Sequence, residues 1–266
     1  MPSYLITGTS RGLGLGFVTE LAFHCPRSLP ALREQLKNPD NVVIATARDP
    51  DKSSGLQELK AKHGDGTGQL HLVSLDVIKP DSVHRAAEAA QKLLPNGLDY
   101  LISNAGVNYS PLKSLDEMDM DDFKAEIEFN VTAPMYLFRE FSLLVRRSSV
   151  KKIMVVTSAL GSLEFSGPNV GPCDAYSVAK SALNMLTRKW SAALKKDGIT
   201  TFLIHPGYIG GTDMGADIGE WVAENMPDLP NLTTETSCSD CLKVLHDSTA
   251  DDNGLFFSHN GTKWPW

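Results

Sequence analysis

The feature that most constrains the fold is the alternation of short, β-branched apolar runs with longer helix-forming segments. This pattern predicts a parallel sheet with right-handed crossovers and helices on both of its faces. At 266 residues, 42% of them hydrophobic, the chain is long enough to bury the core of one such domain. We therefore expect a single α/β domain, residues 1–266, with a doubly wound parallel sheet of about seven strands at 3–7, 41–48, 70–74, 98–103, 152–157, 200–205 and 254–258.

A glycine-rich turn directly follows the first expected strand. The stretch Thr7-Gly8-Thr9-Ser10-Arg11-Gly12-Leu13-Gly14 joins this strand to a segment with helical spacing. A strand, a glycine turn and a helix N-terminus in this order aim backbone N–H groups at a pyrophosphate, and glycine is needed where side chains would block the approach. The spacing is Gly-x-x-x-Gly-x-Gly, which differs from the Gly-x-Gly-x-x-Gly fingerprint, so a tight connection is the alternative interpretation.

The end of the second expected strand bears on the choice of cofactor. A carboxylate there suits the ribose 2′-hydroxyl of NAD, whereas an arginine suits the 2′-phosphate of NADP. The chain has Ala47 and Arg48 at this point, and Arg11 lies in the glycine turn. Two guanidinium groups near one phosphate favour NADP. The alternative is that both arginines are solvated at the surface.

A tyrosine and a lysine, Tyr176 and Lys180, stand four residues apart in a helix-forming segment. At this spacing both side chains lie on one face of a helix and can enter the same cleft. We expect the cation to stabilise the phenolate and to lower the tyrosine pKa from about 10, which makes the hydroxyl a usable proton donor or acceptor. The pair alone is weak evidence, because the same spacing occurs by chance in amphipathic helices.

Polar residues follow the other expected strands at the edge where parallel sheets bind ligands. They are Asp76-Val77, Asn104-Ala105-Gly106, Ser158 and His205-Pro206-Gly207-Tyr208-Ile209, and Asn130 lies in a helix expected over 119–147. Singly, each has a structural interpretation. Asp76 could form a turn, Ser158 could cap a strand end, and Asn130 could satisfy a buried backbone group.

In this order, the motifs resemble the short-chain dehydrogenase/reductase family over nearly the whole chain. Thr212-Asp213-Met214-Gly215 and the closing stretch Asn260-Gly261-Thr262-Lys263-Trp264-Pro265-Trp266 further resemble its subgroup of sniffer and C-factor-like carbonyl reductases. The resemblance implies a Rossmann-type fold and an NADP(H) cofactor. It also implies an NADPH-dependent reductase that transfers a hydride to a ketone or aldehyde carbonyl, with reversible alcohol oxidation.

The resemblance gives each matching residue a role. Tyr176 would donate the proton, Lys180 would assist it and hold the nicotinamide ribose, Ser158 would orient the carbonyl, and Asn130 would hold a relay water. The expected cofactor-binding residues are Gly8, Ser10, Arg11, Gly12, Leu13, Gly14, Arg48, Asp76, Val77, Asn104, Ala105, Gly106, Tyr176, Lys180, Pro206, Gly207, Ile209 and Thr212. No metal site is expected.

Three segments depart from the family pattern. The stretch 14–48 is extended, the loop 161–174 is long enough to add a substrate-facing segment, and Gly210-Gly211 adds a residue before Thr212. With these paired glycines, the stretch 210–230 is expected to form a small lid over the substrate.

Charge and composition argue against several classes of partner. A net charge of -7 and a pI near 5.5 disfavour binding to nucleic acid or to an anionic membrane. We expect no secretory signal, and four cysteines in a chain of this length suit a reduced, cytoplasmic protein, with Cys238 and Cys241 as ordinary helix-start residues. The expected partner is a small carbonyl or alcohol molecule. The family resemblance also implies a homodimer or a homotetramer, and both remain open at this point.

Two other functions share parts of this pattern. A non-catalytic dinucleotide-binding redox sensor or scaffold would keep the pocket and lose the tyrosine, lysine or serine, whereas this chain keeps Tyr176, Lys180 and Ser158. A dehydratase or epimerase acting on nucleotide sugars shares Tyr-x-x-x-Lys. Such enzymes usually have a larger C-terminal domain, for which the residues after His205 leave little room.

Overall fold

The computed structural model describes residues 1–22, 41–62, 69–166 and 171–266. The expected insertions in 14–48 and 161–174 therefore lie partly outside the described residues. The described part contains one parallel sheet in the order β3-β2-β1-β4-β5-β6-β7. Its strands are β1 (Ser3–Thr7), β2 (Val42–Ala47), β3 (Gln69–Ser74), β4 (Tyr100–Ser103), β5 (Lys152–Val156), β6 (Thr200–His205) and β7 (Phe256–Ser258).

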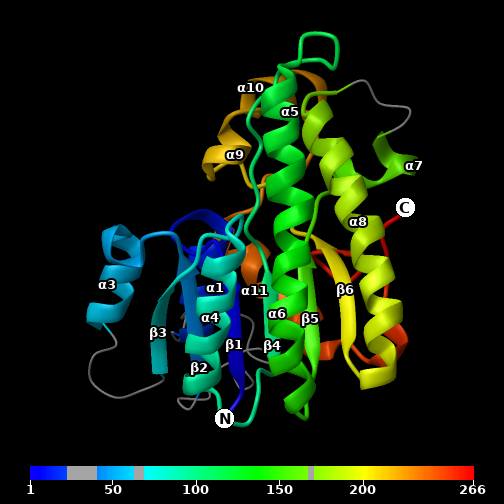
Figure 1. Cartoon of the computed structure of the whole chain (residues 1–266). Coiled ribbons are helices and arrows are strands. Elements are labelled where there is room, and N and C mark those ends of the chain that lie inside the picture. Colours follow the sequence, from blue (N-terminus) through cyan, green and yellow to red (C-terminus); the bar gives the residue numbers. More distant parts are fainter. Residues whose placement is uncertain (23–40, 63–68, 167–170) are drawn as a thin grey trace.

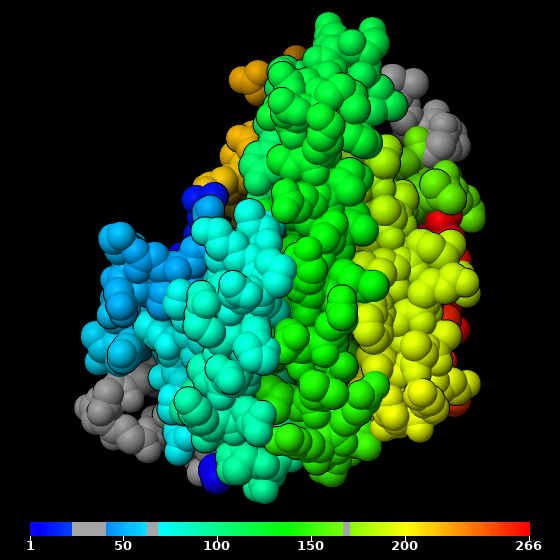
Figure 2. Space-filling model, in the orientation of Figure 1, coloured from blue at the N-terminus to red at the C-terminus, as the bar shows by residue number. Residues whose placement is uncertain are grey.

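Helices cover both faces of this sheet (Figure 1). One face carries α1 (Gly12–Ala22), α3 (Ser54–Lys62) and α11 (Thr234–Asp247), and the other carries α4 (Pro80–Leu93), α6 (Ala133–Arg147) and α8 (Asp174–Leu194). Figure 2 shows side chains of the second group as a continuous layer over the sheet. The predicted Rossmann-type architecture is confirmed.

Short elements gather mainly at the carboxyl edge of the sheet, where α9 and α10 lie at the top of Figure 1. They are α5 (Met120–Ile127), α7 (Leu163–Ser166), α9 (Asp213–Ala216), α10 (Gly219–Asn225) and the 3₁₀ turns Pro50–Lys52, Ala159–Gly161, Lys195–Asp197 and Ala250–Asp252. The strand order changes direction between β1 and β4. In an open parallel sheet this change leaves a crevice beyond the strand ends, and ligands bind there.

Buried aliphatic and aromatic residues form two hydrophobic cores, one on each face of the sheet. All residues of β1 and β2 are buried, as expected for strands covered on both faces. Phe138 and Phe141 of α6 fill the core on one face, and Phe17 of α1 and Leu242 of α11 fill the core on the other.

The helix expected over 119–147 is not a regular α-helix throughout. A π-helical turn, η2 (Glu128–Thr132), separates α5 from α6 and carries Asn130 at its centre. Residue 134 is proline, which has no N–H, so the Asn130 carbonyl cannot accept the usual i+4 hydrogen bond. The expected helical stretch with Asn130 buried at its middle is confirmed, and the π-helical turn before Pro134 is an additional feature.

Phe138→Ala tests the core beneath α6. The Phe138 ring is fully buried, so the cavity left by its removal should lower the free energy of unfolding by about 3–5 kcal/mol in denaturant titrations. Leu143→Ala is the control on the same helix, because Leu143 is 54% exposed and its loss should change this free energy by less than about 0.5 kcal/mol. Equal effects of the two variants would contradict the described packing.

Candidate active site

Hydrogen bonds join the ends of β1 and β4 beneath the glycine turn. The Thr7 hydroxyl oxygen accepts from the backbone N–H groups of Asn104 and Ala105, both at 3.0 Å. In return, the Asn104 amide donates to the Thr7 carbonyl at 2.9 Å. The two motifs, far apart in the sequence, therefore form one wall of the crevice.

The glycine turn has the shape that a dinucleotide requires. Gly8 and Gly12 have φ values of +71° and +56°, which side-chain-bearing residues rarely adopt. A Cβ on Gly14 would lie 2.1 Å from the Gly8 carbonyl oxygen, and one on Gly8 would lie 2.9 Å from the Ala105 Cα. Helix α1 begins at Gly12, so its free N–H groups face the bare turn. This cradle fits a pyrophosphate.

The predicted adenosine end contains three charged residues, Arg11, Arg48 and Asp76. Arg11 Nε lies 3.0 Å from Asp213 Oδ2, and both side chains are more than 70% exposed. Such a surface pair is worth about 1 kcal/mol or less, so it leaves Arg11 able to turn toward another anion. Arg48 is exposed, and Asp76 has a buried Oδ1 with no hydrogen-bond partner among the described residues.

The loop after β6 closes the other side of the crevice. A Cβ on Gly12 would lie 3.8 Å from the Thr212 methyl group, which places this loop beside the glycine turn. Thr212 caps α9 by accepting from the Gly215 N–H, and Ile209 is buried. Ser237 donates to the Pro206 carbonyl at 2.6 Å, and Gly207 has a φ of +86°.

Tyr176, Lys180 and Ser158 meet at the end of β5. The Tyr176 and Lys180 side chains are 8% and 2% exposed, and Lys180 Nζ lies 5.3 Å from the centre of the Tyr176 ring. Lys180 Nζ donates to the Val156 carbonyl at 3.2 Å. The Ser158 side chain, two positions beyond β5, lies close enough to Tyr176 to act toward lowering the pKa of its hydroxyl.

The expectation that the lysine lowers the tyrosine pKa is not met in this structure. Burial raises the Tyr176 pKa, nearby Cys173 and Glu126 raise it further, and only the hydrogen bond with Ser158 opposes them. Burial also lowers the Lys180 pKa to about 8, against the influence of Glu126. The reason is desolvation, which disfavours the charged form of each group. Tyr176 is consequently held as a neutral phenol.

Asn130 lies directly across Gly106 from Lys180. A Cβ on Gly106 would lie 3.2 Å from Asn130 Oδ1 and 3.3 Å from Lys180 Nζ. The Asn130 amide donates to the carbonyls of Val107 and Glu126 at 2.9 and 3.1 Å. The structural interpretation of Asn130 is thus met, and Pro134 cannot donate an N–H to its backbone carbonyl.

Two buried residues at this site were missed by the sequence reasoning. Glu126 of α5 is 1% exposed and accepts from the Tyr109 N–H at 3.0 Å. Cys173 precedes α8 with a φ of 73°, and its sulfur accepts from the Asn108 side chain at 3.1 Å. A signal for Glu126 was present, because it stands four residues before Asn130 and therefore on the same helix face.

Cys238 and Cys241 lie inside α11, not at its start as expected. Both are fully buried. Cys238 packs against α1, where a Cβ on Gly16 would lie 2.7 Å from its sulfur, and burial raises the pKa of both thiols. Their role in this structure is packing. Within the described residues, no group of three or more His, Cys, Asp or Glu side chains could hold a metal.

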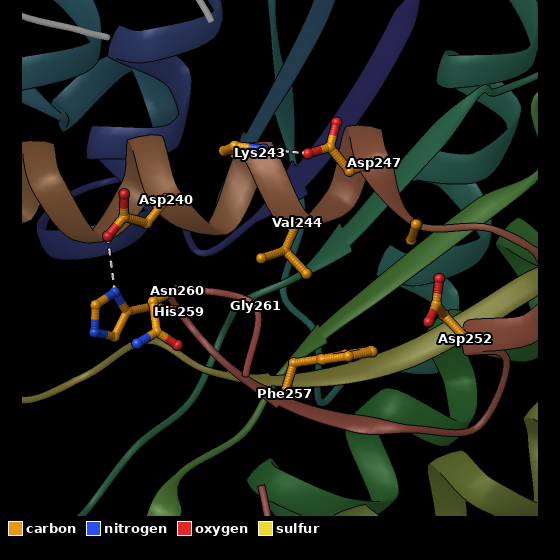
Figure 3. Close-up of a pocket in the computed structure, with 10 residues that line it drawn as sticks. Asp240, Lys243, Val244, Asp247, Asp252, Phe257, His259, Asn260 and Gly261 are labelled. Atoms are coloured by element: carbon orange, nitrogen blue, oxygen red, sulfur yellow. Dashed lines mark hydrogen bonds and ion pairs between the residues drawn. The ribbon is translucent and has the colours of Figure 1, made fainter. Parts of the chain in front are cut away.

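A separate hollow of about 340 Å³ lies between α11 and the segment 257–261 (Figure 3). Asp240 pairs with His259 at 2.8 Å, and Lys243 pairs with Asp247. Four side chains of this lining thus form two pairs within the chain, and the predicted site residues lie elsewhere. In the described part of the chain, no helix is both long and apolar enough to cross a membrane.

The comparisons with known proteins identify the family. A family model described as short chain dehydrogenase matches residues 3–223. The chain belongs to the short-chain dehydrogenase family. Its curated relatives include a short chain dehydrogenase of Penicillium aethiopicum, 32% identical, with 98% of each chain covered. They also include an uncharacterized oxidoreductase of Schizosaccharomyces pombe, 30% identical over 99% of this chain and 97% of the relative.

Solved structures agree with this short-chain dehydrogenase assignment. An NADPH-bound carbonyl reductase from chicken fatty liver is 30% identical, with a TM-score of 0.78 over 100% of this chain and 99% of that chain. Carbonyl reductase Sniffer of Drosophila melanogaster has a TM-score of 0.81, with 100% of both chains covered. Its identity is 24%, so this second likeness supports the fold. The predicted membership of the short-chain dehydrogenase family is confirmed.

Gly14→Ala tests the close packing of the glycine turn in this short-chain dehydrogenase. The new methyl group would lie 2.1 Å from the Gly8 carbonyl, so the turn must shift and the free energy of unfolding should fall by about 1–3 kcal/mol. Gly211→Ala is the matched control, since no described atom lies within 4 Å of the added Cβ. A Gly14→Ala variant as stable as Gly211→Ala in urea titrations would contradict this geometry.

Proposed function

We propose that this short-chain dehydrogenase is an NADPH-dependent reductase that transfers a hydride to a ketone or aldehyde carbonyl and catalyses the reverse alcohol oxidation. The observation that carries the proposal is that Tyr176 and Ser158 meet beside the buried Lys180 at the carboxyl edge of the sheet, with Lys180 Nζ 5.3 Å from the centre of the Tyr176 ring. These groups share that edge with the bare glycine cradle. A proton donor and a dinucleotide cradle on one edge suit reduction of a carbonyl.

In this proposal the substrate carbonyl oxygen receives two hydrogen bonds, from Ser158 and from Tyr176. Both donors stabilise negative charge as it develops on that oxygen. The raised pKa of Tyr176 keeps its proton in place until that charge appears. Lys180 then stabilises the resulting phenolate, and Asn130 holds the water that returns a proton.

NADP(H) is the cofactor that we propose, and it would supply the hydride. The glycine turn from Gly8 to Gly14 would hold its pyrophosphate, and Arg48 would bind its 2′-phosphate. The similar carbonyl reductase from chicken fatty liver binds NADPH, which supports this choice. The other proposed cofactor contacts are those predicted from the sequence, at Asp76, Val77, Asn104, Ala105, Gly106, Lys180, Pro206, Gly207, Ile209 and Thr212.

We further propose that residues 1–266 act as one unit and that 210–230 form a lid over the substrate. This segment contains α9 and α10, and it is tied down at its two ends. Gly210 N–H donates to the Asn231 side chain at 2.8 Å, and Tyr208 donates to the Gly215 carbonyl at 3.1 Å. The exposed Arg11–Asp213 pair links the lid to the cofactor cradle.

Tyr176→Phe tests the proton donor. Loss of the hydroxyl should lower kcat for carbonyl reduction by at least about a hundredfold, because general acid catalysis contributes about 10²–10⁴. NADPH affinity, measured by fluorescence titration, should stay close to that of the parent enzyme. The parent is first screened against diketones, quinones and aldehydes. Near wild-type turnover by the variant would reject the mechanism.

Arg48→Ala tests the cofactor preference. Removing the guanidinium should weaken NADPH binding by about tenfold or more, equivalent to about 1.4 kcal/mol, and leave NADH binding nearly unchanged. Lys52→Ala is a control for general charge loss, since Lys52 is also exposed but pairs with Asp49. Equal weakening of both nucleotides by Arg48→Ala would count against the 2′-phosphate contact.

A further inference from the structure

Glu126 is a buried carboxyl group that has only one of its two oxygens bonded. Its Oε2 accepts from the Tyr109 N–H at 3.0 Å, whereas its Oε1 is buried without a hydrogen-bond partner among the described residues. The residue is 1% exposed. A half-bonded carboxyl group in a protein interior is costly, and its presence calls for a compensating charge or a function.

The groups that face Glu126 come from three elements. Asp122 precedes it on α5, Tyr109 lies in the loop after β4, and Tyr176 and Lys180 lie on α8, which Cys173 precedes. Of these groups Lys180 alone carries a positive charge. The two residues also share a neighbour, because the Asn130 amide donates to the Glu126 carbonyl and Asn130 Oδ1 lies across Gly106 from Lys180 Nζ.

Lys180 needs such a partner to keep its proton. The side chain is 2% exposed, and burial lowers its pKa to about 8. Glu126 is the group that raises this pKa, and Lys180 in turn opposes the rise that burial causes in the pKa of Glu126. Each buried charge therefore reduces the cost of the other.

We propose that Glu126 is a positioning residue for Lys180, acting as the buried counter-ion that keeps its ammonium group charged beside Tyr176. Without this carboxylate, desolvation acts on the lysine unopposed, and the cleft loses the cation that stabilises the phenolate. The catalytic consequence rests on the proposed function of Tyr176 and Lys180. The pairing of the two charges does not depend on it.

A purely structural role is the competing explanation. Glu126 holds the loop after β4 through Tyr109, and Asp122 holds the same loop by accepting from the Ser110 hydroxyl at 2.8 Å. Asp122 has no influence of its own on the Lys180 pKa among the causes that act there. Glu126 and Asp122 of α5 thus anchor the same loop, and of these two carboxylates only Glu126 acts on the Lys180 pKa.

Three variants separate charge from anchoring. Glu126→Gln keeps an oxygen for the Tyr109 N–H and removes the charge, Glu126→Asp keeps the charge, and Asp122→Asn weakens the loop anchor while leaving the carboxyl group of Glu126 in place. In Glu126→Gln, the alkaline limb of the kcat profile for carbonyl reduction should move to lower pH by about one unit or more. The sign follows because removing the carboxylate lowers the pKa of Lys180 and also that of Tyr176, so both lose their protons at lower pH.

Glu126→Asp should keep the alkaline limb within a few tenths of a unit of the parent, and Asp122→Asn should leave its position unchanged. A profile for Glu126→Gln that coincides with the parent profile would overturn the proposal. So would an equal shift in Asp122→Asn, because the effect would then come from the loop.

Direct titration of Lys180 makes the test independent of turnover. Protein labelled with ¹³C at the lysine ε-carbons is titrated by NMR without cofactor or substrate, and the Lys180 resonance is assigned by its loss in Lys180→Met. Its midpoint should fall in Glu126→Gln and stay in place in Asp122→Asn. An unmoved midpoint refutes the charge pairing. A shifted midpoint in an enzyme that reduces no carbonyl keeps the pairing and rejects the proposed function.

Discussion

Desolvation at the carboxyl edge of the sheet governs the chemistry available to this protein. A phenol, an amine and a carboxyl group are packed there with little contact with water, and each is pushed toward its neutral form. Tyr176 therefore keeps its proton as a neutral phenol. The pKa of Lys180 is low enough that a nearby charge decides whether its amine is protonated. The protonation states at this site therefore depend on two opposing effects, desolvation by burial and pairing with an opposite charge.

The scaffold makes this balance possible by fixing the groups from different strands and helices. Parallel strands bring the ends of β1, β4, β5 and β6 to one edge, and the hydrogen bonds between Thr7 and Asn104 lock two of these ends together. Fully buried strands cannot shift easily, because the core on either side is filled. Because the strand ends are rigid, they can hold charged side chains in a place that excludes water, where solvent screens these charges less.

Much of the fold could be predicted because its signals are local. The strands were placed to within two residues or so, since β-branched runs bounded by glycine and proline are unambiguous in a sheet covered on both faces. The helical stretch over 119–147 was predicted with Asn130 buried at its middle, whereas the π turn next to Pro134 was not foreseen. The buried positions of Cys238 and Cys241 were missed because they depend on packing of α11 against α1.

The candidate site was predictable in its residues and less so in its electrostatics. Tyr176, Lys180, Ser158 and Asn130 come together, yet the direction of the tyrosine pKa was wrong, because burial cannot be read from the spacing of two residues. Glu126 was overlooked for the same reason. Its importance arises from Lys180, a neighbour in space that lies on a different helix and far along the chain.

The proline after the π turn has a consequence for protein engineering. The carbonyl at position 130 lacks its usual i+4 donor because residue 134 is proline, and exchanging the asparagine side chain would not restore that N–H. Replacements at position 130 thus probe the amide group alone. To give the carbonyl oxygen its usual helical hydrogen bond, Pro134 would have to be replaced by a residue that has a backbone N–H.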